Sequence, residues 1–424
     1  MNKILDLLEK SKTSFHAVNE AKAILNANGF IELNEKKPFI IEKNRKYYVT
    51  RNDSSLIAFT IGNKATGFNI VASHTDSPCF KVKYGKALTS AGTTKLPVEQ
   101  YGGALRYTWF DRPLKLCGRL CGEKNGKIIS VIHDFDHFFV IPSVAIHFKR
   151  NVNESLSVNA QTDCPPLFAL GVDTELLKKT VDEAFDGTLL DCDLFLVCNE
   201  KPFECGLNGE FACAPRVDNL TSCFSSIEAL INSSNDEFIN VAFLADNEEV
   251  GSRTKQGAGS KFLYDVIQRV YYSLSNNDED FKIALANSVM VSCDNAHAVH
   301  PNHPELSDMT DNVLLGSGIV IKHHANQNYT TDGFSSALFK NILKKNNVPY
   351  CDFYMRSDMP CGGTLGAISS SQISINSIDV GLPQLAMHSA NETAAVSDLC
   401  DMVKVLTELY SSGIEKQGDA INIK

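Results

Sequence analysis

The sequence has 424 residues, of which 43% are hydrophobic and 21% are charged, and its formal net charge at pH 7 is −10. A chain of this length and composition is expected to fold as an ordinary globular protein with two or more domains. The acidic balance argues against a nucleic-acid partner, which would favour a basic surface, and without a run of about 18 apolar residues the chain is not expected to cross a membrane.

The cysteines and the first residues of the chain indicate a location. The 13 cysteines are scattered and form no CxxC pair, so reduced thiols are expected rather than a thiolate zinc site. Asp6 and Glu9 interrupt the short apolar stretch at residues 1–10, which is unlike a signal peptide. We therefore expect a cytoplasmic protein.

The N-terminal part predicts one helix followed by strands. Apolar residues spaced for one helix face begin after Ser14, and Gly29 can end that helix. Strand-like stretches follow at residues 46–50, 56–61 and 68–72. The last stretch is apolar on consecutive positions, which is typical of a strand covered on both faces.

Between residues 80 and 203 the pattern changes to alternating strands. Residues 114–121 and 127–132 flank Asn125-Gly126, a dipeptide typical of a tight turn between antiparallel strands. One short helix is expected near residues 173–186. The sequence thus predicts a β-rich domain at 80–203, inserted into a discontinuous domain formed by residues 1–79 and 204–424.

After residue 204, helices and strands alternate along the chain. Helices are predicted at residues 219–232, 260–275, 334–346 and 391–411. Strands are predicted at residues 238–245, 288–293, 349–353 and 374–380. Because strands joined through helices usually lie parallel, this alternation predicts an α/β fold with a mostly parallel central sheet flanked by helices.

Five polar clusters each follow a strand-like segment. They are His74-Thr75-Asp76, Arg216-Val217-Asp218-Asn219, Asn247-Glu248-Glu249, Cys293-Asp294-Asn295-Ala296-His297 and Met387-His388-Ser389. Ligands of open parallel sheets gather beyond the carboxyl ends of the strands, so we expect these clusters to converge. Histidines and carboxylates without cysteine suit a divalent ion such as zinc, manganese or cobalt.

Two of the clusters carry a direct argument for a site. His74 and Asp76 project to the same side of an extended chain, so Asp76 can hold the imidazole through its second nitrogen. Glu248 and Glu249 end a buried strand, where two adjacent carboxylates are costly without cations. A surface dipeptide and a solvated acidic turn are the alternatives for these two pairs.

The remaining candidates are open to a structural explanation. Asp218 can either bridge two cations or cap the helix that follows it, since Asp is a favoured N-cap. Asp294, at a strand end, is similarly ambiguous. His388 precedes Ser389-Ala390-Asn391-Glu392, which fits a capping box at the start of the last helix. Each signal is weak alone, and only the set predicts a site.

These segments resemble those of the M18 metallopeptidases, the aspartyl aminopeptidase family, from about residue 10 to residue 412. The resemblance lies in residues 72–78, 216–220, 246–252, 294–302 and 387–389. It implies a fold of the zinc-peptidase type whose inserted domain drives dimerisation. It also implies a homo-oligomer in which the dimers assemble into a dodecamer.

The resemblance implies two divalent metal ions in each subunit, most simply zinc, with manganese or cobalt as alternatives. His74 and Asp294 would hold one ion, Glu249 and His388 would hold the other, and Asp218 would bridge the two. Asp76 would orient His74. Glu248 would act as the general base toward a metal-activated water.

Four further residues match substrate contacts of the family: His147, His297, Lys322 and Tyr329. His147 would reach the active site of a neighbouring subunit, although a satisfied strand histidine is the simpler explanation. For His297 a solvated loop histidine is the default explanation, and Lys322 is equally explained as an exposed strand lysine. Lys322 is also the one candidate for selecting an acidic first residue, because an ammonium can pair with a carboxylate.

The function implied is a metalloaminopeptidase that hydrolyses the N-terminal residue of peptides, with a preference for Asp or Glu. A different two-metal amidohydrolase, such as a deacylase or a carboxypeptidase, is one alternative, and the need for a free N-terminus would distinguish it. A non-catalytic assembly protein of the same fold is another. Metal content together with peptide turnover would decide that case.

Overall fold

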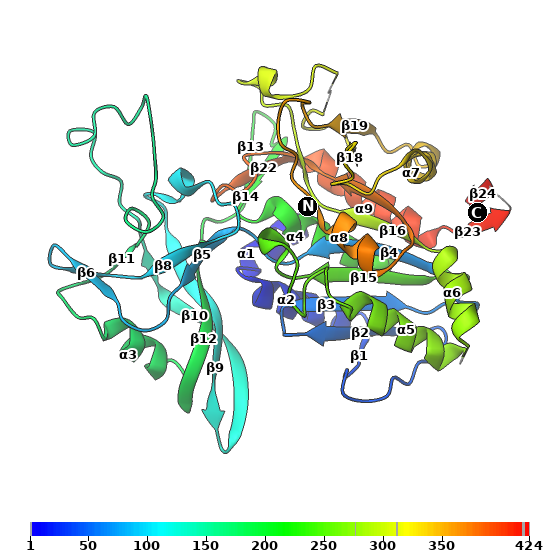
Figure 1. The fold of residues 1–424 in the computed structure, drawn as a ribbon, viewed down its shortest axis with the longest axis horizontal. Coiled ribbons are helices and arrows are strands. Elements are labelled where there is room, and N and C mark those ends of the chain that lie inside the picture. Colours follow the sequence, from blue (N-terminus) through cyan, green and yellow to red (C-terminus); the bar gives the residue numbers. More distant parts are fainter. Residues whose placement is uncertain (1, 276, 311–312, 418–419, 424) are drawn as a thin grey trace.

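The computed structural model describes residues 2–275, 277–310, 313–417 and 420–423. Two bodies of secondary structure lie side by side in it (Figure 1). The larger body is built on a nine-stranded sheet, and the smaller on a five-stranded sheet whose strands all come from residues 79–198. The stretch predicted as an inserted domain is therefore β-rich, and its boundaries at 80 and 203 stay a prediction.

The central sheet is mixed and mostly parallel. From one edge to the other, its strands are β1 (Ile31–Glu32), β2 (Lys46–Arg51), β3 (Ser55–Thr60), β15 (Ile239–Ala245), β4 (Phe68–His74), β16 (Val289–Cys293), β20 (Asn376–Gly381), β18 (Ile319–His323) and β19 (Tyr350–Tyr354). The pairs β2–β3, β3–β15 and β18–β20 are antiparallel, and the other pairs are parallel. The three strands at its centre, β15, β4 and β16, are parallel and fully buried.

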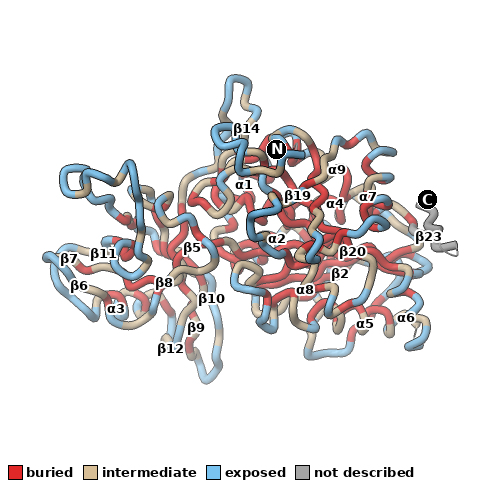
Figure 2. Tube along the Cα trace, turned by 45° about the horizontal axis from the view of Figure 1, so that its top comes forward, coloured by how far each residue is buried: buried red, intermediate tan, exposed pale blue. Residues whose placement is uncertain are grey.

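Helices cover both faces of this sheet. One face packs against α1 (Asn2–Lys10), α2 (Ser14–Ala27), α4 (Val217–Asn232), α7 (Gly333–Lys345) and α9 (Val396–Ser411). The other face packs against α5 (Phe262–Leu274), α6 (Asp278–Ala286) and α8 (Leu365–Gln372). Successive residues of β4 alternate between the two cores, with Val71 in the first and Ile70 and Ala72 in the second. Figure 2 shows the buried residues running through the middle of this layered body.

Most predicted elements are confirmed, but the last helix begins later than predicted. Residues Glu392–Ala395 form the short strand β22, and α9 begins at Val396. The predicted capping box is wrong, because the Glu392 carboxylate accepts hydrogen bonds from the backbone N–H groups of Asp218 and His388 instead. The helices α6 and α8 were not predicted from the sequence.

The smaller body confirms the predicted hairpin. Its five-stranded sheet runs in the order β10 (Lys127–Phe139), β9 (Leu114–Lys124), β12 (Thr188–Cys198), β5 (Cys79–Val82) and β8 (Val98–Tyr101). Asn125 and Gly126 join β9 to β10, with φ of 54° and 75°, as expected for a tight hairpin turn. A three-stranded sheet of β11 (Leu167–Leu170), β7 (Thr93–Lys95) and β6 (Leu88–Ser90) and the helix α3 (Leu176–Glu183) complete it.

A second five-stranded sheet connects distant parts of the chain next to the central one. Its order is β13 (Phe203–Cys205), β14 (Phe211–Ala214), β22, β21 (Pro383–Leu385) and β17 (Ala296–His297). Near the end of the chain, β23 (Ile414–Gln417) pairs with β24 (Ala420–Ile423). Short 3-10 helices lie at Arg106–Trp109, Glu248–Val250 and Pro304–Leu306.

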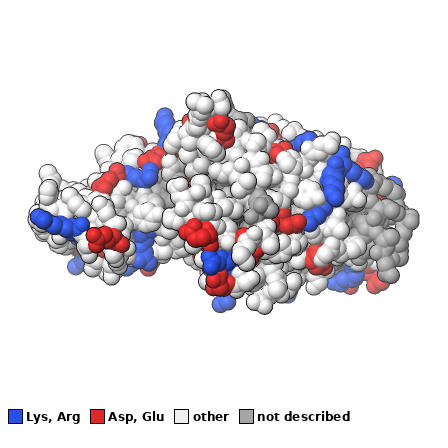
Figure 3. Space-filling view, turned by 90° about the horizontal axis from the view of Figure 1, so that it is seen from above, with Lys and Arg blue, Asp and Glu red and all other residues white. Residues whose placement is uncertain are grey.

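The surface view in Figure 3 shows Lys and Arg side chains scattered among Asp and Glu, separated by broad uncharged areas.

In the part of the chain that the structure describes, no helix combines the length and the apolar character that a bilayer crossing would need.

Gly381, the last residue of β20, lies against the backbone that leads to Asp294. A Cβ atom at position 381 would lie 2.0 Å from the carbonyl oxygen of Asp294. We therefore expect Gly381→Ala to lower the free energy of unfolding by about 1–3 kcal/mol, as overpacking does. Thermal unfolding measures this, with Gly363→Ala, at a glycine with open space around it, as the control. Equal melting temperatures for the two variants would contradict the prediction.

Candidate metal centre

Four of the candidate side chains come from the ends of three neighbouring parallel strands. His74 is the last residue of β4, and Asp294 directly follows β16. Glu248 and Glu249 lie in the 3-10 turn that begins three residues after β15. Because β15, β4 and β16 are adjacent and parallel, their carboxyl ends lie at one edge of the central sheet. The convergence predicted from the sequence is present for these residues.

Asp218 and His388 instead follow strands of the second five-stranded sheet, which contains β14, β21 and β22. The expectation that all five clusters follow strands of one sheet is therefore wrong. Asp218 lies just beyond β14, and His388 lies in the turn between β21 and β22. Glu392 holds both turns in place, because its carboxylate accepts from Asp218 N at 2.9 Å and from His388 N at 2.6 Å. Asp218 makes no side-chain cap for α4, so the capping explanation is also wrong.

The turns that carry these side chains are strained. Arg216, Asn247 and His388 are non-glycine residues with φ of 62°, 62° and 66°. Residues in this region cost about 1–3 kcal/mol each and persist only where the surrounding structure holds them. The three outliers flank the candidate site, which is where such strain is usually retained.

Together the five side chains form two groups of three that share Asp218. In the first group, His74 Nε2 lies 3.6 Å from Asp218 Oδ1 and 3.6 Å from Asp294 Oδ1. In the second, His388 Nε2 lies 3.4 Å from Asp218 Oδ2 and 3.4 Å from Glu249 Oε1. Ligands bound at about 2.0–2.1 Å around a tetrahedral zinc ion lie about 3.3 Å from one another. The spacing of both groups therefore suits one such ion each.

Two buried oxygens in this cluster have no hydrogen-bond donor. They are Asp218 Oδ1 and Glu249 Oε1, in carboxylates that expose only 4% of their side chains. A buried carboxylate oxygen without a donor is destabilising unless a cation meets it. The donor set of imidazoles and carboxylates and these unpaired oxygens fit a pair of divalent ions.

The protonation of the cluster reflects crowded negative charge. Burial by itself lowers the pKa of His74, but the carboxylates of Asp218, Asp294 and Asp76 outweigh it and raise that pKa well above its usual range. For His388 the same opposition, with Asp218 and Glu249, raises the pKa to about 10. Protons thus compensate the carboxylates here, and bound metal ions would displace them.

Glu248 belongs to neither group, but with His74 and Glu249 it forms a third, overlapping set of possible ligands. Burial raises its pKa to about 8, and the neighbouring Asp294 and Asp76 carboxylates add to the increase while His74 opposes it. Within the described residues, its carboxylate has no hydrogen-bond partner. Glu248 can therefore exchange a proton with a molecule bound at the cluster.

Asp76 lies at the second nitrogen of His74, as predicted, and has a further role that the sequence did not indicate. His74 Nδ1 lies 3.0 Å from the backbone oxygen of Asp76 and 3.4 Å from its carboxylate. The carboxylate itself accepts from Glu248 N and Glu249 N, both at 3.1 Å, and from the hydroxyl of Tyr101 at 2.7 Å. Asp76 thus fixes the Glu248–Glu249 turn as well as His74.

Tyr101 was missed by the sequence analysis, which named Asn247 only as a member of a polar cluster. The amide of Asn247 donates to the hydroxyl of Tyr101 at 2.8 Å, and Tyr101 ends β8 of the smaller body. Next to it, a Cβ atom at Gly102 would lie 3.0 Å from that of Glu249. Nothing in the local sequence distinguishes Tyr101 from any other strand tyrosine.

The predicted substrate residues separate into two environments. Lys322 is 2% exposed, so its explanation as an exposed lysine is wrong; its ammonium donates to Asn295 O at 3.0 Å and lies 3.9 Å from Asp294 Oδ2. Tyr329 is also buried, with its ring 5.1 Å from the Lys322 ammonium. His297 lies in β17, three residues beyond Asp294, and is exposed.

His147 does not join the cluster within this chain. It lies in an exposed turn rather than in a strand, so its explanation as a satisfied strand histidine is wrong. It belongs to none of the candidate metal groups found among the described residues. Contact with a neighbouring subunit stays a prediction.

A separate set of possible ligands has a structural explanation. His16, Cys117 and Asp134 lie close together between α2 and the β9–β10 hairpin. His16 Nε2 is 3.0 Å from Asp134 Oδ1, and the Lys12 ammonium pairs with the other carboxylate oxygen. This arrangement is an ion-pair network that already neutralises Asp134.

Comparison with known proteins places this geometry in a family. Residues 7–410 match the family of aminopeptidase I zinc metalloproteases (M18). The probable M18 family aminopeptidase 2 of Clostridium novyi is 41% identical, over 97% of this chain and 98% of its own length. That of Ectopseudomonas mendocina is 41% identical, over 96% of this chain and 97% of its own.

Solved structures share the fold. The structure of the Ape4 and Nbr1 complex matches with a TM-score of 0.91 and 34% identity, over 96% of this chain and 85% of the other. The S. cerevesiae mApe1 dodecamer matches with a TM-score of 0.83 and 27% identity, over 96% and 95%. The family match over nearly the whole chain and the relatives at 41% identity show that this chain belongs to the M18 family of aminopeptidases, which are zinc metalloproteases.

Proposed function

We propose that this chain is a two-metal aminopeptidase that removes the N-terminal residue of peptides, with Glu248 as its general base. The observation that carries the proposal is the sharing of Asp218: one of its oxygens faces His74 and the other faces His388. A carboxylate used in this way is suited to bridging two ions. His74 and Asp294 would hold one ion, and Glu249 and His388 the other.

When bound, the two ions would supply Lewis acidity toward the scissile carbonyl and an acidified water. The chain itself supplies the proton transfers. Glu248 accepts a proton from the attacking water and then donates it to the leaving amine, as a general base followed by a general acid. Asp76 supports this role by binding the backbone N–H of Glu248, which fixes the turn on which the carboxylate stands.

The activity is tested with a panel of aminoacyl chromogenic amides, assayed after chelation and refilling with zinc, manganese or cobalt. Only amides with a free α-amine should be hydrolysed. Equal turnover of N-acetylated amides would indicate a deacylase or another amidohydrolase. A fully metal-loaded protein that hydrolyses none of them would favour the non-catalytic assembly protein.

Glu248→Gln keeps the shape of the side chain and removes its ability to take a proton. We expect it to retain both metal ions and to lower kcat by about 10²–10⁴-fold, the usual contribution of general acid–base catalysis. Metal analysis and steady-state kinetics measure the two effects. Glu279→Gln, on the exposed side of α6, is the control. A rate near that of the wild type would remove Glu248 from the role of base.

The metal-free protein should lose stability as the pH rises. The pKa of Glu248 is raised from 4.5 to about 8 and that of His388 from 6.5 to about 10, so between about pH 5 and 10 the folded state holds more protons than the unfolded state. We expect the melting temperature of chelated protein to fall between pH 6 and pH 8.5. Zinc should raise it more at pH 8.5, because the metal replaces those protons. A zinc effect that is independent of pH would contradict the metal assignment.

The preference for acidic first residues is a further part of the proposal, supported by the buried Lys322 ammonium beside Asp294. We expect Lys322→Ala to lower kcat/KM for Asp- and Glu-amides by at least about tenfold more than for Leu-amides, because a buried charge pair is lost. Lys340→Ala, which removes a lysine already paired with Asp352, is the control. An equal decrease in kcat/KM for acidic and apolar amides would contradict this prediction. It would indicate that Lys322 positions Asp294 instead.

Assembly into a homo-oligomer through the smaller body also belongs to the proposal. Large apolar side chains are exposed there, including Phe148 at 88% and Leu170 at 92%. Exposed apolar groups of this size favour contact with another chain. A relative of known structure, mApe1, forms a dodecamer. The mass of the native particle tests this point, and a monomer would exclude it.

The predicted location in the cytoplasm is consistent with the free state of all 13 cysteines.

A further inference from the structure

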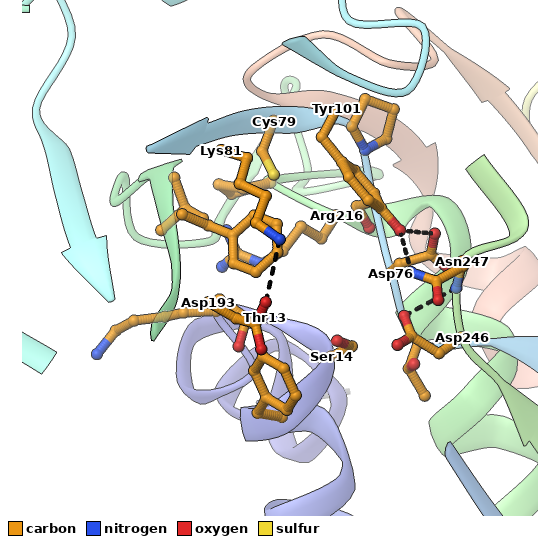
Figure 4. Close-up of a pocket in the computed structure, with 18 of the residues that line it drawn as sticks. Thr13, Ser14, Asp76, Cys79, Lys81, Tyr101, Asp193, Arg216, Asp246 and Asn247 are labelled. Atoms are coloured by element: carbon orange, nitrogen blue, oxygen red, sulfur yellow. Dashed lines mark hydrogen bonds and ion pairs between the residues drawn. The ribbon is translucent and has the colours of Figure 1, made fainter. Parts of the chain in front are cut away.

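A cavity lies between the two bodies of the protein, and Asp76 is one of the residues that line it. Its volume is about 470 Å³, within the range of small-molecule sites. Figure 4 shows Arg216 between the Lys81–Asp193 pair on one side and the group of Asp76, Tyr101 and Asn247 on the other. None of the five candidate metal ligands is among the described residues that line it. The cavity therefore adjoins the metal centre, because Asp76 and Glu392 border both, but it contains none of the five candidate ligands.

Arg216 is a cation without a counter-ion in this cavity. Its guanidinium donates to two backbone carbonyls, Cys198 O at 3.1 Å and Leu8 O at 3.0 Å, and its Nε–H is buried without an acceptor. No carboxylate of the described residues forms an ion pair with it. An enclosed charge is costly unless it is paired, so this arrangement favours an anion beside Arg216.

The other cations around the cavity are already paired with a carboxylate or lie at its edge. Asp193 pairs with Lys81 at 3.0 Å and with Arg119 at 2.8 Å. Lys12 pairs with Asp134. Lys255 lies on the exposed rim, where it can attract an anion without holding it.

The described carboxylates that border the cavity form no ion pair with Arg216 and have other partners. Asp76 and Glu392 each accept two backbone N–H groups near the metal centre. Asp246 accepts the N–H of Asn247 and is 3% exposed. Of the described cations that line the cavity, Arg216 and the rim residue Lys255 are thus the two without a carboxylate partner.

The only tryptophan of the sequence borders the same space. Trp109 is 2% exposed, packs edge-on against Phe80, and its Nε1–H has no acceptor. Trp109 thus borders the cavity with its ring, while its N–H is buried away from the cavity surface. Phe195 and Val197 extend the apolar part of that wall. The lining as a whole combines the Arg216 guanidinium with an apolar surface.

We infer that this cavity binds a small organic carboxylate with an apolar body. The carboxylate pairs with the Arg216 guanidinium, and the ring of Trp109 borders the bound molecule. The apolar body lies against Phe195 and Val197. The donors of the site come from residues other than the five candidate metal ligands.

The fluorescence of Trp109 reports this binding directly, because no other tryptophan contributes. We expect 3-phenylpropionate to change the emission of the zinc-loaded protein saturably. The neutral 3-phenylpropionamide should bind at least about tenfold more weakly, since a hydrogen bond to a charged group is lost. Inorganic phosphate should also bind at least about tenfold more weakly, since it lacks an apolar body. Equal affinities for acid and amide, equal affinities for acid and phosphate, or no saturable change would each overturn the inference.

Two variants test the position of the site. Arg216→Met should weaken binding of 3-phenylpropionate at least about tenfold, whereas Arg45→Met, at an exposed arginine paired with Glu42, should leave it unchanged. Because Arg216→Met also removes two hydrogen bonds to the backbone, Val197→Phe provides a second test that keeps the guanidinium and fills the space. Wild-type affinity in Val197→Phe, or in a folded Arg216→Met protein, would show that the acid binds elsewhere.

Discussion

One constraint governs the structure: the fold must hold several negatively charged carboxylates close together in its interior. Four carboxylates, those of Asp218, Glu248, Glu249 and Asp294, gather around two imidazoles in a buried cluster. Like charges at this spacing repel, and burial strengthens the repulsion. Without metal, raised pKa values of Glu248, Glu249 and the two histidines relieve it. The surrounding core must therefore hold the side chains together until cations neutralise them, and the fully buried strands β15, β4 and β16 provide that support.

The carboxylates of the site differ in what their oxygens contact, and this separates their roles. Asp76 and Glu392 accept backbone N–H groups and so hold turns in place. Asp218 and Glu249 each leave a buried oxygen without a donor. Residue type and burial are the same in both pairs. Only the hydrogen-bond partners distinguish a positioning carboxylate from one that is available to a cation.

The smaller body takes part in the site as well as in any assembly. Tyr101 at the end of β8 binds Asp76, and a Cβ atom at Gly103 would lie 3.1 Å from Nδ1 of His388. The backbone after β8 thus lies against ligands contributed by the larger body, which requires glycine at this close approach. The same junction encloses the cavity around Arg216. A change in the packing between the two bodies would therefore be felt at both sites.

The sequence by itself determined the local elements and the residue types of the site. Apolar runs that end in His74, Asp294 or the Glu248–Glu249 pair predict strands with ligands at their carboxyl ends, because both properties depend on neighbouring residues. The tertiary structure alone decided that Asp218 is not a cap, that Glu392 begins a strand, that Lys322 is buried and that Tyr101 supports Asp76. Each of these depends on contacts between segments that are far apart in the chain, and local patterns of hydrophobicity contain no information about such contacts.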